Sequence, residues 1–140
     1  MAGYLPEDAN EDGFADGWYR TGDVGFISAD GWVHLTDRSK EMIKVKGFQV
    51  APAEIEAVLH SHPAVLDCAV FGVPDEQAGE RPVAAVKLDP STTLDPGELI
   101  ELVRVSLATY KHLSEVTVVD EIPRLPSGKV LRRNLRDVWL

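Results

Sequence analysis

The fold is decided by one stretch of the chain, residues 37–56, which reads Asp37-Arg38-Ser39-Lys40-Glu41-Met42-Ile43-Lys44-Val45-Lys46-Gly47-Phe48-Gln49-Val50-Ala51-Pro52-Ala53-Glu54-Ile55-Glu56. Its middle, residues 42–50, alternates in part between apolar and polar side chains, which indicates a β-strand. On a strand, Lys44 and Lys46 would point to the same face, because successive side chains alternate. Gly47 interrupts the run and predicts either a tight turn or a place where a ligand approaches the backbone.

A helix is expected to follow over residues 52–61. Pro52 suits the first helical position, and Pro63 ends the run. Ile55, Val58 and Leu59 recur at helical spacing and form an apolar stripe. The stretch therefore predicts a strand, a glycine turn and an amphipathic helix in succession.

On either side of this stretch, strands and helices interleave. Asp30-Gly31 separates two apolar runs, residues 24–27 and 32–35, and is a strong signal for a β-hairpin. The other predicted elements are strands over 65–73, 82–88 and 116–119, a helix opening with a capping box at Asp95, a last helical turn or two over 131–137, and loops over 6–17 and 74–80. The pattern fits an α/β or α+β class. We predict α+β: a short β-hairpin, a three-stranded sheet and flanking helices, preceded by another β-hairpin.

Length and composition exclude several classes of protein. The 140 residues suit one domain, and their formal net charge of −9 argues against a general nucleic-acid binder. The apolar runs are too short to span a membrane, and the N-terminus lacks the features of a signal peptide. Cys68 is the single cysteine, so no internal disulfide can form and a reducing, cytoplasmic setting is expected.

The basic residues gather in two short windows, residues 38–50 and 121–137, each with a net charge of +3. One interpretation is that both windows are solvated faces of the protein. The other is that they assemble into a single site for an anion such as phosphate or a nucleotide.

Metal and cysteine chemistry are not expected. His60 and His62 lie two residues apart, without the i, i+4 spacing or the further ligands that a metal pair needs. Cys68 sits among apolar residues in a predicted strand, which favours packing over a nucleophilic role. We therefore predict no metal ligand in this chain.

Three motifs, in this order, carry a resemblance to a known family. They are Trp18-Tyr19-Arg20-Thr21-Gly22-Asp23, the stretch 37–56, and Pro123-Arg124-Leu125-Pro126-Ser127-Gly128-Lys129-Val130-Leu131-Arg132-Arg133. Together they resemble the C-terminal part of the adenylate-forming, AMP-binding enzymes, over residues 3–140. The sequence from Lys46 to Glu56 looks most like acyl- and aryl-CoA ligases and luciferases. The resemblance implies that residues 1–37 are the end of a large N-terminal adenylation domain and residues 38–140 a mobile C-terminal domain.

The resemblance also implies roles for individual residues. Lys129 matches the lysine of the adenylation step, and Lys44 matches a lysine that faces the adenylate during thioester formation. Asp23 would bind the ribose hydroxyls of the nucleotide, Arg38 would contact ribose or phosphate, and Gln49 would face the adenylate. Lys40 matches the lysine at the hinge between the two domains. Gly47 matches a glycine along the path of CoA, and Lys46 is a weaker candidate for contacting CoA.

By the same resemblance, the full enzyme joins a carboxylic acid to CoA with ATP, through an acyl-adenylate and AMP, and requires Mg²⁺. The resemblance thus implies a ligase of the acyl-CoA synthetase type that acts in fatty acid metabolism. The ATP phosphate loop, the Mg²⁺ ligand and the acyl pocket of the family lie in the large N-terminal domain. This chain alone is therefore expected to be inactive and to bind no cofactor tightly, whether it is truncated, a shortened reading frame or one piece of a split enzyme.

Two alternatives remain open from the sequence. The chain could be a non-catalytic docking module of a split or truncated ligase, or part of an adenylation domain that loads a carrier protein. Expected partners are the N-terminal adenylation domain, a small carboxylic acid and CoA, with self-association through exposed apolar surface of residues 1–37. The acyl substrate cannot be read from these residues.

Overall fold

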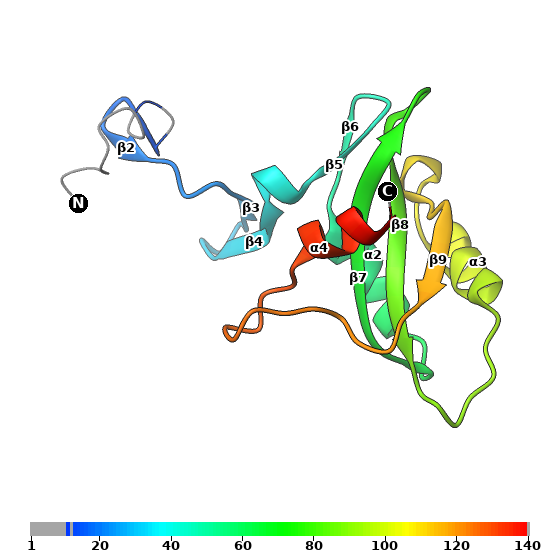
Figure 1. Cartoon of the computed structure of the whole chain (residues 1–140). Coiled ribbons are helices and arrows are strands. Elements are labelled where there is room, and N and C mark those ends of the chain that lie inside the picture. The colour runs from blue at the N-terminus through cyan, green and yellow to red at the C-terminus, as the bar shows by residue number, and fades with distance from the viewer. Residues whose placement is uncertain (1–10, 12, 140) are drawn as a thin grey trace. The chain divides into compact units, whose positions relative to one another are not determined.

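The computed structural model describes residue 11 and residues 13–139 (Figure 1). The chain divides into two compact units, one ending at Lys40 and the other beginning at Glu41. This division falls three residues beyond the expected boundary between residues 37 and 38. The interpretation of residues 1–37 as the end of a larger domain remains a prediction.

The first unit contains two β-hairpins. Strands β1 (Phe14–Ala15) and β2 (Trp18–Tyr19) are antiparallel and are joined by a turn in which Asp16 and Gly17 both have positive φ. The prediction of a loop over 6–17 is therefore wrong at β1, and residues 6–10 and 12 of it lie outside the described residues. The Asp-Gly turn compensates for the shortness of the strands, because this backbone geometry matches their twist.

The second hairpin is the one predicted from Asp30-Gly31. Strands β3 (Asp23–Ile27) and β4 (Val33–Arg38) pair antiparallel, and Gly31 takes a positive φ of 88° in the connecting turn. Ser28 N–H donates to the carbonyl of Trp32 at 2.9 Å and closes the turn.

The second unit is built on one five-stranded sheet with the order β6-β5-β8-β7, and with β9 parallel to β8. Its strands are β5 (Ile43–Val45), β6 (Phe48–Val50), β7 (Val65–Asp75), β8 (Gly79–Leu88) and β9 (Glu115–Val118). The predicted hairpin and three-stranded sheet are both present, and the pairing of Val45 with Gly79 joins them.

The predicted loop over 74–80 is shorter than expected. Pro74 pairs with Glu80 and Asp75 with Gly79, so β7 and β8 continue almost to the turn. Asp75 stabilises this tight turn, because its carboxylate accepts from the N–H groups of Gln77 and Ala78. Proline and charged residues hid the strand ends from sequence analysis.

Helices cover both faces of the sheet (Figure 1). On one face, α2 (Pro52–His60) and α3 (Pro96–Ser106) pack Ile55, Leu59, Leu99 and Val103 onto the strands. On the other face lies α4 (Arg132–Trp139), with Leu135 against Phe71 and Val83. Short 3₁₀ turns are η1 (Ser39–Glu41) and η2 (Thr109–Lys111). The α+β class is confirmed, with the sheet between two helical layers.

A local signal explains where α3 begins. The Asp95 carboxylate accepts from Gly97 N–H at 2.8 Å and the Glu98 side chain accepts from Asp95 N–H, which is the predicted capping box. Cys68 is buried in β7 as predicted, and this burial raises the pKa of its thiol to about 12. None of the helices in the part of the chain that the structure describes is long and apolar enough to cross a lipid bilayer.

Candidate functional site

Asp23 and Arg38, the two predicted nucleotide-binding residues of the first unit, are cross-strand partners on β3 and β4. Arg38 Nε lies 3.3 Å from Asp23 Oδ1. The Asp23 side chain is 25% exposed and the Arg38 side chain 60%. A carboxylate has acceptor sites beyond one ion pair, so Asp23 retains capacity to accept from vicinal hydroxyl groups.

Lys44 and Gln49 are brought together by the β5–β6 hairpin. They lie opposite each other in its register, and both are exposed. Lys44 lies between the buried residues Ile43 and Val45, so its side chain points away from the core that α2 and α3 cover. Its backbone N–H donates to Glu80 Oε2 at 2.7 Å, which ties the hairpin to the start of β8.

Lys46 does not share a strand face with Lys44, and that prediction is wrong. Lys46 and Gly47 form the two-residue turn between β5 and β6, with φ values of 49° and 85°. Because both residues have positive φ, the glycine is needed for the turn itself. A Cβ on Gly47 would meet nothing within 4 Å, so its side-chain position is open on this chain.

Lys129 lies directly after a hydrogen-bonded turn. Gly128 N–H donates to the Leu125 carbonyl at 2.8 Å, and Gly128 has a φ of 84°. Arg124 braces the turn, because its Nη1 donates to the Gly128 carbonyl and its guanidinium also binds the Asp67 carboxylate on β7. The lysine side chain is 53% exposed.

The two basic windows meet at Glu41, which is the acidic residue of the first window. One Glu41 oxygen lies 3.1 Å from Lys129 Nζ, and the other pairs with Arg132. Arg132 also binds Glu56 Oε1 at 2.7 Å and donates to the Val70 carbonyl. Sequence analysis missed Glu41 and Glu56, because the cations that define their role lie far along the chain.

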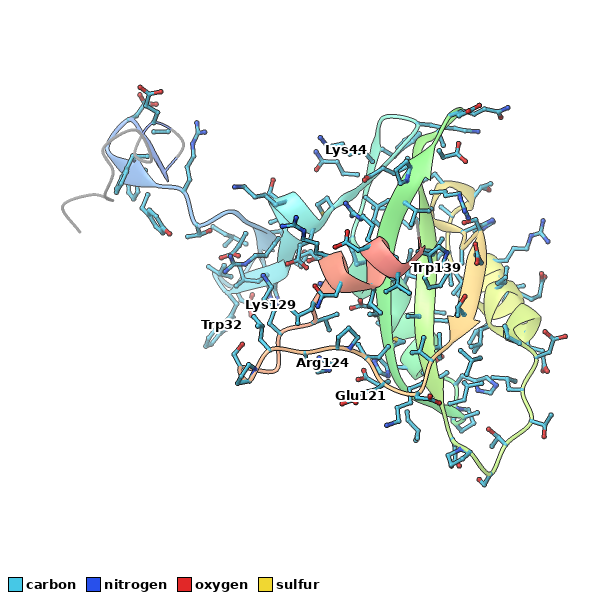
Figure 2. All side chains as sticks on the ribbon, viewed as in Figure 1. Trp32, Lys44, Glu121, Arg124, Lys129 and Trp139 are labelled. Atoms are coloured by element: carbon cyan, nitrogen blue, oxygen red, sulfur yellow. The ribbon has the colours of Figure 1, made fainter. Side chains whose placement is uncertain are left out.

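Lys44 and Lys129 lie on different elements of the second unit, and Figure 2 shows them apart. Lys40 is exposed within η1, at the residue where the two units divide. The structure thus places the predicted residues in three groups: the β3–β4 pair, the β5–β6 hairpin and the loop before α4.

Within residues 11 and 13–139, no three His, Cys, Asp or Glu side chains are arranged to hold a metal ion. His62 Nδ1 instead accepts from Ala64 N–H at 3.2 Å, just after the end of α2. The donor set of the described residues therefore does not fit a Mg²⁺ site.

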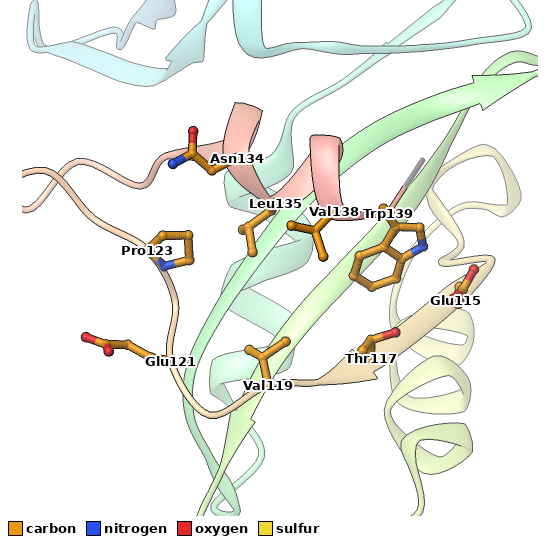
Figure 3. Close-up of a pocket in the computed structure, with 9 residues that line it drawn as sticks. All are labelled: Glu115, Thr117, Val119, Glu121, Pro123, Asn134, Leu135, Val138 and Trp139. Atoms are coloured by element: carbon orange, nitrogen blue, oxygen red, sulfur yellow. The ribbon is translucent and has the colours of Figure 1, made fainter.

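A groove of about 670 Å³ lies beside α4 and β9 (Figure 3). Leu135, Val138 and Trp139 of α4 form one side, and Thr117 and Val119 come from β9 and the residue after it. Its lining does not include the predicted site residues.

Comparison with known proteins gives consistent results. A family model described as the AMP-binding enzyme C-terminal domain matches residues 54–129. The chain is 51% identical over its whole length to "4-coumarate--CoA ligase-like 9" of Oryza sativa subsp. japonica, and it covers 26% of that protein. The chain spans about a quarter of the length of the curated relatives it matches.

Solved structures of other proteins are also similar to this chain. The amide bond synthetase McbA from Marinactinospora thermotolerans aligns with a TM-score of 0.90 at 38% identity, over all of this chain and 29% of that one. The o-succinylbenzoate CoA synthetase (MenE) from Bacillus subtilis, in complex with the acyl-adenylate intermediate OSB-AMP, aligns with a TM-score of 0.85 at 38% identity, over 95% of this chain and 27% of that one.

Proposed function

Because the chain belongs to the family of AMP-binding enzyme C-terminal domains, we propose that it is the C-terminal part of an ATP-dependent carboxylic acid–CoA ligase. The observation that carries the proposal is the separation of two exposed lysines within one compact unit. Lys44 lies beside Gln49 on a β-hairpin, and Lys129 lies on a glycine turn before α4. A domain that turns about Lys40 could present each lysine to the same adenylate in succession.

In the first step, a carboxylate oxygen of the acid attacks the α-phosphorus of ATP. A new C–O–P linkage forms, the bond to the bridging oxygen breaks and pyrophosphate leaves. Lys129 supplies a positive charge between the two reacting anions, where it lowers their repulsion and stabilises charge in the transition state. Asp23 accepts hydrogen bonds from the ribose hydroxyls, and Arg38 binds ribose or phosphate.

In the second step, the CoA sulfur attacks the acyl carbon of the adenylate, the thiol proton is lost to solvent or a base, and AMP leaves. Lys44 and Gln49 face the adenylate in this arrangement. Gly47 leaves the pantetheine path open, and Lys46 at the same turn contacts a CoA phosphate. Any Mg²⁺ that the full-length enzyme uses would be held by residues outside the described ones, and it would neutralise charge on the nucleotide phosphates.

The test uses the full-length ligase and measures the two half-reactions separately. Lys129→Ala should lower acyl-adenylate formation by about a thousandfold, since one unit-charge contact is worth roughly 4 kcal/mol at an effective dielectric of 20. It should spare thioester formation from pre-made adenylate. Lys44→Ala should do the reverse. Equal losses in both half-reactions for both variants would overturn these roles.

Chain 1–140 alone should show no ATP–pyrophosphate exchange, because the other nucleotide-binding groups lie elsewhere. Detectable exchange would contradict the proposal.

Relatives are named for 4-coumarate, so a panel of aromatic and fatty acids offered to the full-length enzyme decides between aryl substrates and fatty acid metabolism. We place the enzyme in the cytoplasm, where the free thiol of Cys68 would stay reduced.

A docking module is the second candidate function, favoured by the exposed apolar side chains of the β3–β4 hairpin. Phe26, Ile27 and Trp32 are all more than half exposed. If the chain acts by docking to a separate adenylating subunit, it should co-purify with that subunit, and ligase activity should require both chains. A carrier-protein substrate is the remaining alternative. Loading of a phosphopantetheinylated carrier in place of free CoA would support it.

A further inference from the structure

Glu41 lies between two cations of different exposure. One of its carboxylate oxygens lies 3.1 Å from Lys129 Nζ in an ion pair, and the other pairs with Arg132. The Lys129 side chain is 53% exposed, whereas the Glu41 and Arg132 side chains are 19% and 18% exposed. Glu41 therefore forms ion pairs with both an exposed lysine on a surface loop and a mostly buried arginine.

The arginine end of this chain of contacts is firmly held. Arg132 Nη2 donates to Glu56 Oε1 on α2 at 2.7 Å, and Arg132 Nε donates to the Val70 carbonyl on β7 at 3.0 Å. Val70 N–H in turn donates to the same Glu56 oxygen at 2.9 Å. The Glu41 carboxylate is thus fixed, through Arg132, to a helix and to a strand of the sheet core.

A partner for the Lys129 side chain matters because the contacts of Arg124 hold the backbone of its loop but not the lysine stem. Its ammonium group ends a four-carbon stem, and fixing such a side chain costs up to about 2 kcal/mol of rotamer entropy. An ammonium group has three donors. With the ion pair to Glu41 occupying one side of the ammonium group, two donors remain, which is the number needed to bridge an acid oxygen and a phosphate oxygen.

We propose that Glu41 is a positioning residue for Lys129 in the adenylate-forming step. This inference rests on the proposed function. Glu41 restrains the lysine stem through one N–H and leaves the other two directed to the reacting anions. Because Glu41 and Lys129 belong to the same compact unit, a rotation at Lys40 carries both of them together. The restraint is therefore already in place when the domain reaches the adenylation arrangement.

The test introduces Glu41→Ala and Glu41→Gln into the full-length ligase. Glu41→Ala should lower kcat for adenylation by roughly ten- to a hundredfold, the value of a hydrogen bond to a charged group. The KM for ATP should stay unchanged, because the effect is on the orientation of Lys129. Glu41→Gln keeps an acceptor and should recover part of the loss. Thioester formation from pre-made adenylate should be unaffected in both variants.

A matched control is Glu54→Ala. Glu54 binds Lys111 Nζ at 2.6 and 2.7 Å, so this variant also breaks a Glu–Lys ion pair of the same unit. It should leave adenylation within about twofold, as expected for a surface substitution remote from the reacting groups. A loss equal to that of Glu41→Ala would show that general destabilisation is responsible, and would overturn the positioning role.

Two further readouts separate the inference from the proposed function. If Lys129→Ala keeps full adenylation, the proposed function fails; if it abolishes adenylation while Glu41→Ala does not reduce it, only the positioning role fails. In chain 1–140, the NMR signal of the Lys129 ammonium should show slowed proton exchange that Glu41→Ala removes. An unchanged exchange rate would overturn the contact without any measurement of activity.

Discussion

The β3–β4 hairpin and the five-stranded sheet treat their apolar side chains in opposite ways. In the hairpin, Phe26 is 60% exposed and Trp32 70%, although both belong to apolar runs typical of strands. In the sheet, Phe71 is 1% exposed and Val70 fully buried. Two strands form a single layer and cannot cover their own faces, whereas the sheet has helices on both sides. Burial of apolar side chains therefore stabilises mainly the second unit, residues 41–140, which is called the sheet domain below.

The same contrast applies to the proposed site. In the hairpin, the Asp23–Arg38 pair is held by two strands, with a side-chain ion pair across them. In the sheet domain, the Lys129 loop is braced by Arg124, and Glu41 is tied through Arg132 to α2 and β7. The lysine proposed for adenylation is thus positioned by a packed core, whereas the proposed nucleotide-binding pair is held by two strands alone.

The largest expected difference comes from one substitution made in each region. Phe71→Ala removes a buried ring that meets Trp139 edge-on at 5.3 Å, and should lower the free energy of unfolding by about 3–5 kcal/mol. Phe26→Ala removes a ring stacked on His34 at the surface, and should change it by no more than about 0.5 kcal/mol. Urea unfolding followed by far-UV circular dichroism measures both. Equal losses would show that the hairpin folds as part of the same core.

The next largest effect is the pH dependence of the free energy of unfolding that the buried thiol of Cys68 causes. Burial raises the pKa of Cys68 from 9.0 to about 12, and the negative charges of Glu56 and Asp67 add to the shift. The folded state therefore holds the thiol proton more tightly than the unfolded state. The stability this contributes is complete below about pH 9 and is lost as the pH rises towards 12.

Comparison of the wild-type chain with Cys68→Ala measures this contribution. Between about pH 8 and about pH 10.5, the urea midpoint of the wild type should fall further than that of the variant. Parallel pH profiles would contradict the assignment, because all other titrating groups are common to both proteins.

The elements predicted correctly are those with local signals. The capping box at Asp95 and the turn at Gly31 involve residues four or fewer apart, so the sequence is sufficient to locate them. The same Asp-Gly signal occurs at Asp16-Gly17, and weighing it would have revealed the β1–β2 hairpin. Alternation alone misplaced Lys46, because the periodicity does not show where a strand ends and its turn begins.

The contacts that organise the Lys129 loop could not be predicted in this way. Glu41 and Arg132 are 91 positions apart, and Arg124 and Asp67 are 57 apart. Their pairing depends on how α4 and the preceding loop lie on the sheet, which no local pattern encodes. The sequence identified the basic windows as charged segments, but not which bases bind acids within the chain.

A smaller effect is expected on the self-association of chain 1–140. The exposed apolar side chains of the β3–β4 hairpin should cause chain 1–140 to self-associate at high concentration. Replacement of Ile27, Trp32 and Leu35 by serine should shift the sedimentation coefficient to that of a monomer without lowering the unfolding midpoint of the sheet domain. Val105→Ser, at an exposed position of α3, is the control and should leave association unchanged. Concentration-independent sedimentation of the wild type would contradict the prediction.

The smallest expected effect is on the free energy of unfolding when one aspartate is replaced in each of the two regions. Asp95→Ala removes the cap of α3, and should lower the free energy of unfolding by about 1 kcal/mol, because Gly97 N–H loses its acceptor. Asp30→Ala removes a contact with Ser28 Oγ in the exposed hairpin turn, and should leave the unfolding of the sheet domain unchanged. Asp95→Asn should restore most of the stability, since asparagine caps a helix about as well as aspartate. If Asp30→Ala were as costly as Asp95→Ala, unfolding of the sheet domain would have to depend on the hairpin, and the two regions could not be treated as separate in stability.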